Sequence, residues 1–114
     1  MTAKHLLLGR RGERIACRWL LREGFDILTR RWYGRRGELD IVAFEDELLV
    51  FLEVKTRSSA QYGEPWEFVD PRKQLVLQRT AEEFIAEYDL GRYTYRFDIV
   101  SVTGKKVLLY RNAF

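Results

Sequence analysis

Cysteine and histidine are almost missing from this sequence of 114 residues, which has a single Cys17 and a single His5. A lone cysteine excludes an internal disulfide and a cysteine-based zinc site, and a lone histidine leaves no histidine cluster for zinc. Any metal ion that the chain binds must therefore be held by carboxylates.

Long apolar runs are missing too, and none approaches the length that a membrane span needs. We therefore expect no membrane partner, and the lack of disulfides favours a cytoplasmic location. A chain of this length with 46% hydrophobic and 32% charged residues fits one globular domain over residues 1–114. Residues 1–8 are expected to form a flexible N-terminal segment.

The excess of positive charge is small, with 20 Lys and Arg against 17 Asp and Glu and a net charge of +3. Several of the acids fall in one central stretch, so the remaining surface is more basic than the net charge suggests. This distribution favours a polyanionic partner. The basic residues come in pairs at Arg10-Arg11, Arg30-Arg31, Arg35-Arg36 and Lys105-Lys106.

The central stretch, residues 38–57, consists of two apolar segments joined by an acidic turn. Glu38 and Asp40 interrupt the first segment, and Glu53 and Lys55 interrupt the second. Because side chains alternate along a strand, each of these two pairs is expected to share one face of a sheet.

The loop between these strands decides whether the two pairs meet. If the loop has two residues, Asp46-Glu47, position i pairs with position 93 − i, which places Asp40 opposite Glu53. A four-residue loop keeps this even register, whereas an odd loop puts the two pairs on opposite faces. Opposed carboxylates repel each other unless a hard divalent cation lies between them. Lys55 beside that ion can orient a water or stabilise charge on a phosphate.

A set of salt bridges on a solvated face, Glu38–Lys55 and Glu53–Lys55, is the alternative interpretation. The apolar run of residues 48–52 favours a buried central strand instead. Unpaired charge is costly there, so the metal site is the preferred prediction.

Apolar spacing predicts a helix over residues 9–23, with Gly24 as its stop. Glu13 borders its apolar stripe, either as an acid favoured by the helix dipole or as part of the site. One side of the helix carries a row of arginines that is either solvated or in contact with phosphates. The row consists of Arg10, Arg14 and Arg18.

A strand is predicted over residues 25–32, followed by a basic and aromatic loop that leads into the central hairpin. Arginines in this loop can bind phosphates, and Trp32 or Tyr33 can stack on an unpaired base. The alternative is that the aromatic rings fold back onto the core.

The second half begins with a polar loop at residues 57–69, whose length is typical of functional or mobile loops. Asp70-Pro71 then indicates a helix start, and the helical pattern extends to about residue 89. Lys73 and Gln74 fall in its first turns, where backbone N–H groups favour anions.

Two more strands are predicted, over residues 93–102 and 107–110. Asp98 interrupts the first of them, and we expect it to form a salt bridge with an arginine. The order of helix, three strands, helix and two strands predicts a mixed sheet with a helix on each face.

Taken together, these residues resemble the PD-(D/E)xK nuclease pattern and, more narrowly, the YraN-like family of small bacterial predicted nucleases. The resemblance covers about residues 9–102. One departure is Arg31, where the family usually has asparagine. The motifs that carry the resemblance are Gly9–Glu13, Gly37–Ala43, Leu49–Arg57, Lys73-Gln74 and Arg96–Val100.

The resemblance implies a restriction-endonuclease-like three-layer α/β/α core with a mixed five-stranded sheet, similar to that of archaeal Holliday-junction resolvases. It implies that Glu13, Asp40 and Glu53 hold Mg²⁺ or Mn²⁺ and that Lys55 positions the attacking water. Gln74 would be an accessory residue of the same site. A homodimer that grips branched DNA is also implied.

The expected function is therefore a metal-dependent endonuclease that acts on nucleic acid, with DNA as the favoured substrate. The main alternative is a nucleic-acid-binding protein with a nuclease-like fold and no turnover, and a third is a protein-interaction subunit. The residues expected to contact nucleic acid are Arg10, Arg11, Arg35, Arg36, Arg57 and Lys73.

Overall fold

The computed structural model describes the backbone of residues 3–57 and 69–114 and the side chains of residues 10–57 and 69–114. The element order matches the predicted one, with two helices and five strands. The predicted loop at residues 57–69 lies outside the described residues except at its two ends. The elements are α1 (Ala3–Arg22), β1 (Asp26–Tyr33), β2 (Glu38–Glu45), β3 (Leu48–Arg57), α2 (Pro71–Glu87), β4 (Tyr95–Thr103) and β5 (Lys106–Tyr110).

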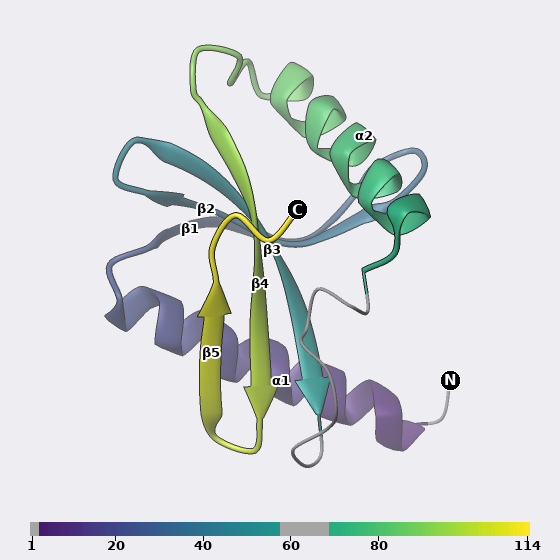
Figure 1. Ribbon diagram of the computed structural model, residues 1–114, viewed down its shortest axis with the longest axis vertical. Coiled ribbons are helices and arrows are strands. Elements are labelled where there is room, and N and C mark those ends of the chain that lie inside the picture. The colour runs from purple at the N-terminus through teal and green to yellow at the C-terminus, as the bar shows by residue number, and fades with distance from the viewer. Residues whose placement is uncertain (1–2, 58–68) are drawn as a thin grey trace.

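The strands form one sheet in the order β1-β2-β3-β4-β5. All neighbouring pairs are antiparallel except β3 and β4, which are parallel because α2 connects them. In Figure 1, α1 crosses the lower part of the sheet and α2 lies against its upper part. The predicted mixed sheet with a helix on each face is confirmed.

The two faces carry separate cores because the central strand alternates between them. Val50 and Leu52 of β3 pack towards α1 with Ala16 and Leu20 of that helix. Phe51 packs on the other face, and α2 contributes residues such as Leu77 and Phe84 to that core. Burial of each such leucine or phenylalanine contributes roughly 1.5–3 kcal/mol to folding.

The central hairpin has the predicted two-residue loop, since Glu45 pairs with Leu48 across the turn. The pairing continues in the predicted register as far as Ile41 and Leu52. Asp46 in the turn has a left-handed backbone (φ 54°), which aspartate tolerates better than most residues.

The helix predicted over residues 9–23 begins earlier, at Ala3, so the segment 3–8 that was expected to be flexible is helical. Its alanine, lysine and leucine residues favour a helix. The second helix starts as predicted, with Pro71 in its first turn and the Asp70 carboxylate accepting a hydrogen bond from the Lys73 N–H at 2.9 Å.

Asp98 is fully buried and forms the predicted salt bridge. The Arg96 guanidinium donates from Nε and Nη2 to its two oxygens, each at 2.7 Å, and Arg96 also reaches Glu45 at 2.7 Å. The N–H of Asn112 donates to Asp98 as well, so this network fixes the C-terminal segment against β4. No helix in the described part of the chain is long and apolar enough to cross a membrane.

Candidate functional site

Asp40 lies where β2 and β3 separate, one position beyond their last backbone pair. Its Oδ2 accepts a hydrogen bond from the Val54 N–H at 2.9 Å, so the carboxylate takes the place of a backbone partner. Val42, two residues further along β2, belongs to the core under α2. Asp40 therefore faces α2, and its orientation is fixed by the fork between the two strands.

Glu53 and Lys55 lie on the same face, because Phe51, two residues before Glu53, packs in the core under α2. Glu53 is 8% exposed and lines a small cavity together with Asp40. The fields of Asp40 and Glu53 both act on Lys55. The hairpin thus brings these three residues together, as the even register predicts.

The pKa of Asp40 is raised from its ordinary 3.8 to about 7. Burial is the main cause, and repulsion by the nearby Glu53 carboxylate adds to it. The hydrogen bond from Val54 and the charge of Lys73 oppose the rise without cancelling it. It is therefore energetically costly for both carboxylates to be ionised at the same time, and a bound cation would reduce that cost.

Lys73 reaches this cluster from the first turn of α2. Its Nζ lies 3.0 Å from Glu53 Oε1, and its amine is close enough to Lys55 to lower the pKa of that lysine. The pKa of Lys55 is lowered, first by burial and then by Lys73, whereas the Glu53 carboxylate raises the pKa of Lys73 against the effect of its burial. Of the two lysines, Lys73 is thus the one that holds its positive charge more firmly, and it is the counter-ion of Glu53.

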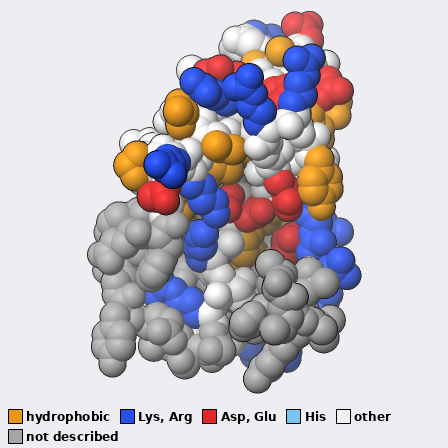
Figure 2. All heavy atoms as spheres, turned by 90° about the vertical axis from the view of Figure 1, so that its right-hand side faces the viewer, with side chains coloured by type: hydrophobic (Ala, Val, Ile, Leu, Met, Phe, Trp, Pro, Cys, Tyr) orange, Lys and Arg blue, Asp and Glu red, His pale blue; other side chains and the backbone are white. Residues whose placement is uncertain are grey.

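The inner side of the cluster is lined mainly by apolar side chains. The cavity between the carboxylates and the core has a volume of about 10 Å³, roughly the space of one water molecule. Figure 2 shows acidic side chains near the middle of one face, with lysine and arginine side chains on both sides of them. This arrangement of charge suits a site that holds a cation and a polyanion together.

Glu13 and Gln74 have other partners in the structure. Both carboxylate oxygens of Glu13 accept from Arg31 Nε, at 3.0 and 3.1 Å, and Gln74 Nε2 donates to the Val69 carbonyl at 3.0 Å. Among the described residues, no three Asp, Glu, His or Cys side chains form a group that could hold a metal ion. The part of the predicted site that the structure assembles is Asp40, Glu53 and Lys55.

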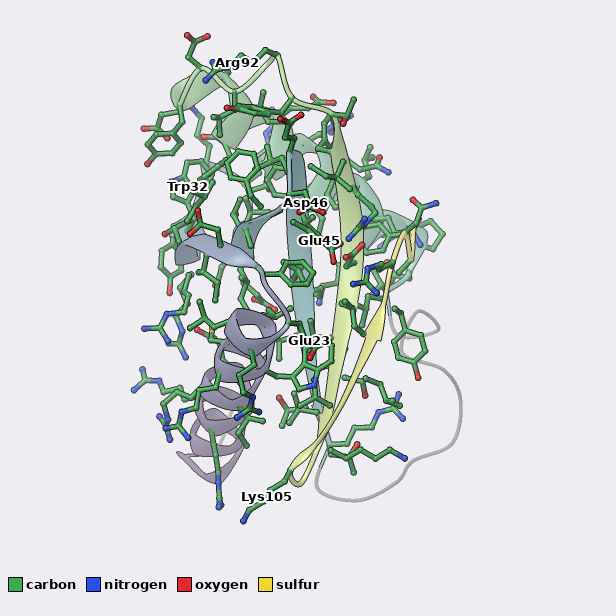
Figure 3. The ribbon with its side chains drawn as sticks, turned by 90° about the vertical axis from the view of Figure 1, so that its left-hand side faces the viewer. Glu23, Trp32, Glu45, Asp46, Arg92 and Lys105 are labelled. Carbon is green, nitrogen blue, oxygen red and sulfur yellow. The ribbon has the colours of Figure 1, made fainter. Side chains whose placement is uncertain are left out.

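The basic and aromatic loop between β1 and β2 is partly folded back. Trp32 packs edge-on against Phe84 at 5.2 Å, and its Nε1–H donates to the Tyr88 hydroxyl at 3.1 Å. Figure 3 shows Trp32 at the outer edge of the molecule. Tyr33 is exposed, and the backbone N–H of Arg35 donates to Glu83 at 3.0 Å. One ring has thus folded onto the core while the other is open to solvent.

Of the residues expected to contact nucleic acid, Arg10 and Arg36 are exposed and Arg11 and Arg57 line a groove beside α1. Lys73 lies in the acidic cluster instead of on an open surface. Its contact with Glu53 could not be found from sequence, since it depends on where the start of α2 lies relative to β3. The signals for Lys73 in the sequence are its position three residues after a helix N-cap and its place in the Lys73-Gln74 motif, and neither points to Glu53.

The family model described as "Uncharacterised protein family UPF0102" matches residues 12–102 of the chain. A UPF0102 protein of Caldicellulosiruptor bescii is 44% identical over 115 residues, covering 94% of this chain and 96% of its own length. A UPF0102 protein of Beutenbergia cavernae is 46% identical over 102 residues, covering 90% and 86%. The matched region contains β1, β2, β3, α2, nearly all of β4 and every residue of the cluster around Asp40, and it ends before β5.

Proposed function

Because the chain belongs to the uncharacterised protein family UPF0102, its own residues must carry the argument, and we propose that it is a metal-dependent endonuclease that hydrolyses phosphodiester bonds in nucleic acid. The observation that supports this most is the convergence of Asp40, Glu53 and Lys55 on one face at the fork of β2 and β3. Two acids and an amine in this arrangement match the needs of phosphoryl chemistry.

Mg²⁺ or Mn²⁺ fits the donor set. Such an ion needs one or two carboxylates, and it takes its remaining ligands from water and from the substrate phosphate. Asp40 and Glu53 supply the two carboxylates, and the raised pKa of Asp40 reflects a repulsion that the ion would remove. Glu13 is a third candidate ligand, but its pair with Arg31 would have to open first.

When bound, the metal ion supplies Lewis acidity, which makes the scissile phosphate more electrophilic and lowers the pKa of a bound water. Asp40 and Glu53 hold it at a fixed place, because one is anchored by the Val54 N–H and the other is buried in β3. The apolar inner wall restricts approach to the outer side, so the phosphodiester must arrive from the surface.

Lys55 is the residue that orients the attacking water in this proposal. Burial and the nearby Lys73 lower its pKa, so it can accept a hydrogen bond from water more readily than an exposed lysine can. With a cation balancing the charge of Glu53, Lys73 would be able to stabilise the negative charge that develops on the phosphate.

A screen of labelled linear, flapped and four-way DNA and RNA, with Mg²⁺, Mn²⁺ or EDTA, tests the proposal. Cleaved product with either ion and none with EDTA is the expected result. The rival function, a nucleic-acid-binding protein without turnover, predicts binding but no product with any ion. A protein-interaction subunit would instead show nucleic-acid affinity with little dependence on salt.

A further inference from the structure

A groove of about 730 Å³ runs between α1 and the ends of β3 and β4, on the α1 side of the sheet. Its floor is formed by small or apolar residues, among them Gly12, Thr56 and Val102. All of the charged side chains along it that the structure describes are basic. They are Arg11, Arg14, Arg18 and Arg22 from α1, Arg57 from β3 and Lys105 from the β4–β5 turn.

Most of the basic side chains that line the groove lack a carboxylate partner among the described residues. Across the described side chains, the arginines on α1 and Lys105 form no ion pair with a carboxylate. The hollow beside α2 differs, because Arg35, Arg36 and Arg79 line it together with Glu82, Glu83 and Glu87. Among the described residues, the charged lining of this groove is therefore basic alone, whereas the lining of the hollow beside α2 is mixed.

Glycine at position 12 lets α1 pack close to β3 along the groove. A Cβ on Gly12 would lie 2.3 Å from Thr56 Oγ1 and 2.7 Å from Thr56 Cγ2, so only glycine lets α1 approach β3 this closely. The backbone of α1 therefore lies close to β3 at this point, and the arginine side chains of the helix line the groove beside it. The groove is a feature of the packing and not only of exposed charge.

The arginines of α1 follow the helix at intervals of three and four residues, which places them on one side. At 1.5 Å per residue, the row from Arg11 to Arg22 is about 16 Å long. Each strand of a duplex presents a phosphate about every 3.4 Å along the axis, so the row faces roughly five phosphates. Figure 3 shows Lys105 at the tip of the β4–β5 turn, from which it adds a further basic side chain to the lining of the groove.

The groove and the acidic cluster meet at the C-terminal end of β3. Lys55 faces the cluster, whereas Thr56 contacts Gly12 on the α1 side and Arg57 lines the groove. A chain of phosphates can therefore pass from the cluster around the edge of β3 to α1. We propose that this groove binds the sugar-phosphate backbone of the nucleic acid, several nucleotides away from the phosphate that is cut. This inference rests on the proposed function.

The test is the binding of a fluorescent 24-base-pair DNA duplex to the full chain in EDTA, measured over a range of salt concentrations. Arg14→Gln/Arg18→Gln removes two groove charges from exposed helix positions. This variant should bind about tenfold more weakly at moderate salt and lose about 1.8 from the slope of log K against log salt. The control variant Arg79→Gln/Arg92→Gln removes two exposed charges elsewhere and should stay within about twofold of the wild type.

Wild-type binding by the groove variant, or an equal loss in the control, would overturn the groove assignment. The same proteins assayed for cleavage separate it from the proposed function. If the protein cleaves nucleic acid but the groove variant binds as tightly as wild type, the groove assignment is wrong and the endonuclease proposal stands. If the groove variant binds more weakly but no protein cleaves, the groove assignment stands and the endonuclease proposal is wrong. Binding to anionic phospholipid vesicles with no affinity for DNA or RNA would overturn both.

Discussion

The Nζ of Lys73, on the first turn of α2, lies 3.0 Å from Oε1 of Glu53 on the central strand. The side chain of Glu53 is 9% exposed and that of Lys73 is 39% exposed, so this ion pair lies at the rim of a buried carboxylate. In the account given above, the lysine stabilises Glu53 until a divalent ion takes its place.

Lys73→Gln should therefore destabilise the protein in EDTA by about 1–2 kcal/mol, because a mostly buried carboxylate loses its counter-ion. The loss stays below that of a fully buried pair because Lys73 is partly exposed. Urea unfolding measures it. Saturating Mn²⁺ should remove most of the difference from wild type.

Arg72→Gln is the matched control, since Arg72 is exposed and has no ion pair with a described residue. It should change the free energy of unfolding by less than about 0.5 kcal/mol. Equal effects of the two substitutions would show that Lys73 contributes nothing specific to Glu53.

Asp40→Asn should make the protein more stable in EDTA at pH 8, by about 1–3 kcal/mol. The folded-state pKa of Asp40, about 7, lies above its ordinary 3.8, so the wild type gains stability from a bound proton at low pH. That gain is lost as the pH rises through 7, whereas asparagine stays neutral and keeps the acceptor for Val54.

Urea unfolding at pH 5 and pH 8 checks this, with Asp46→Asn in the exposed hairpin turn as the control. The advantage of Asp40→Asn should shrink towards pH 5, and the control should show no such trend. A variant that is less stable than wild type at pH 8 would mean that the Asp40 charge is stabilised by something other than a metal.

Glu13→Gln should lower the affinity for Mn²⁺ by less than tenfold, whereas Asp40→Asn and Glu53→Gln should each lower it by more than tenfold. The reason is that Arg31 already binds both oxygens of Glu13, so the ion gains little from it. Isothermal titration calorimetry without nucleic acid makes the comparison. If Glu13→Gln is as damaging as the other two, the ion displaces Arg31 and has three carboxylate ligands.

Gly12→Ala should destabilise the protein by about 1–3 kcal/mol, although alanine favours a helix over glycine by about 1 kcal/mol. The added Cβ would lie too close to Thr56, so α1 must move away from β3. Gly91→Ala is the control, because no atom lies within 4 Å of the Cβ it would add. Stabilisation by Gly12→Ala would show that α1 is not held close at this point.

The parts of this site that follow from strand geometry could be predicted from sequence. Alternation and an even loop place Asp40, Glu53 and Lys55 on one face, and the pairing of Ile41 with Leu52 confirms that register. These relationships are local to one hairpin, so a short stretch of sequence contains all the information they need.

The relationships that join separate elements could not be predicted in this way. The contact of Lys73 with Glu53 depends on how α2 packs, and the pair of Arg31 with Glu13 depends on a left-handed backbone at Arg31 (φ 52°) that strand alternation does not predict. The basic groove likewise needs α1 and the β4–β5 turn to lie side by side.

The most direct test of the central claim is single-turnover cleavage of labelled nucleic acid with Mg²⁺ or Mn²⁺, with protein in excess. Wild type, Glu53→Gln and Lys55→Ala are compared after identical purification, and their folding is checked by thermal unfolding. The account predicts metal-dependent cleavage by wild type and a loss of at least about 100-fold in each variant. Cleavage by either folded variant at the wild-type rate would contradict it.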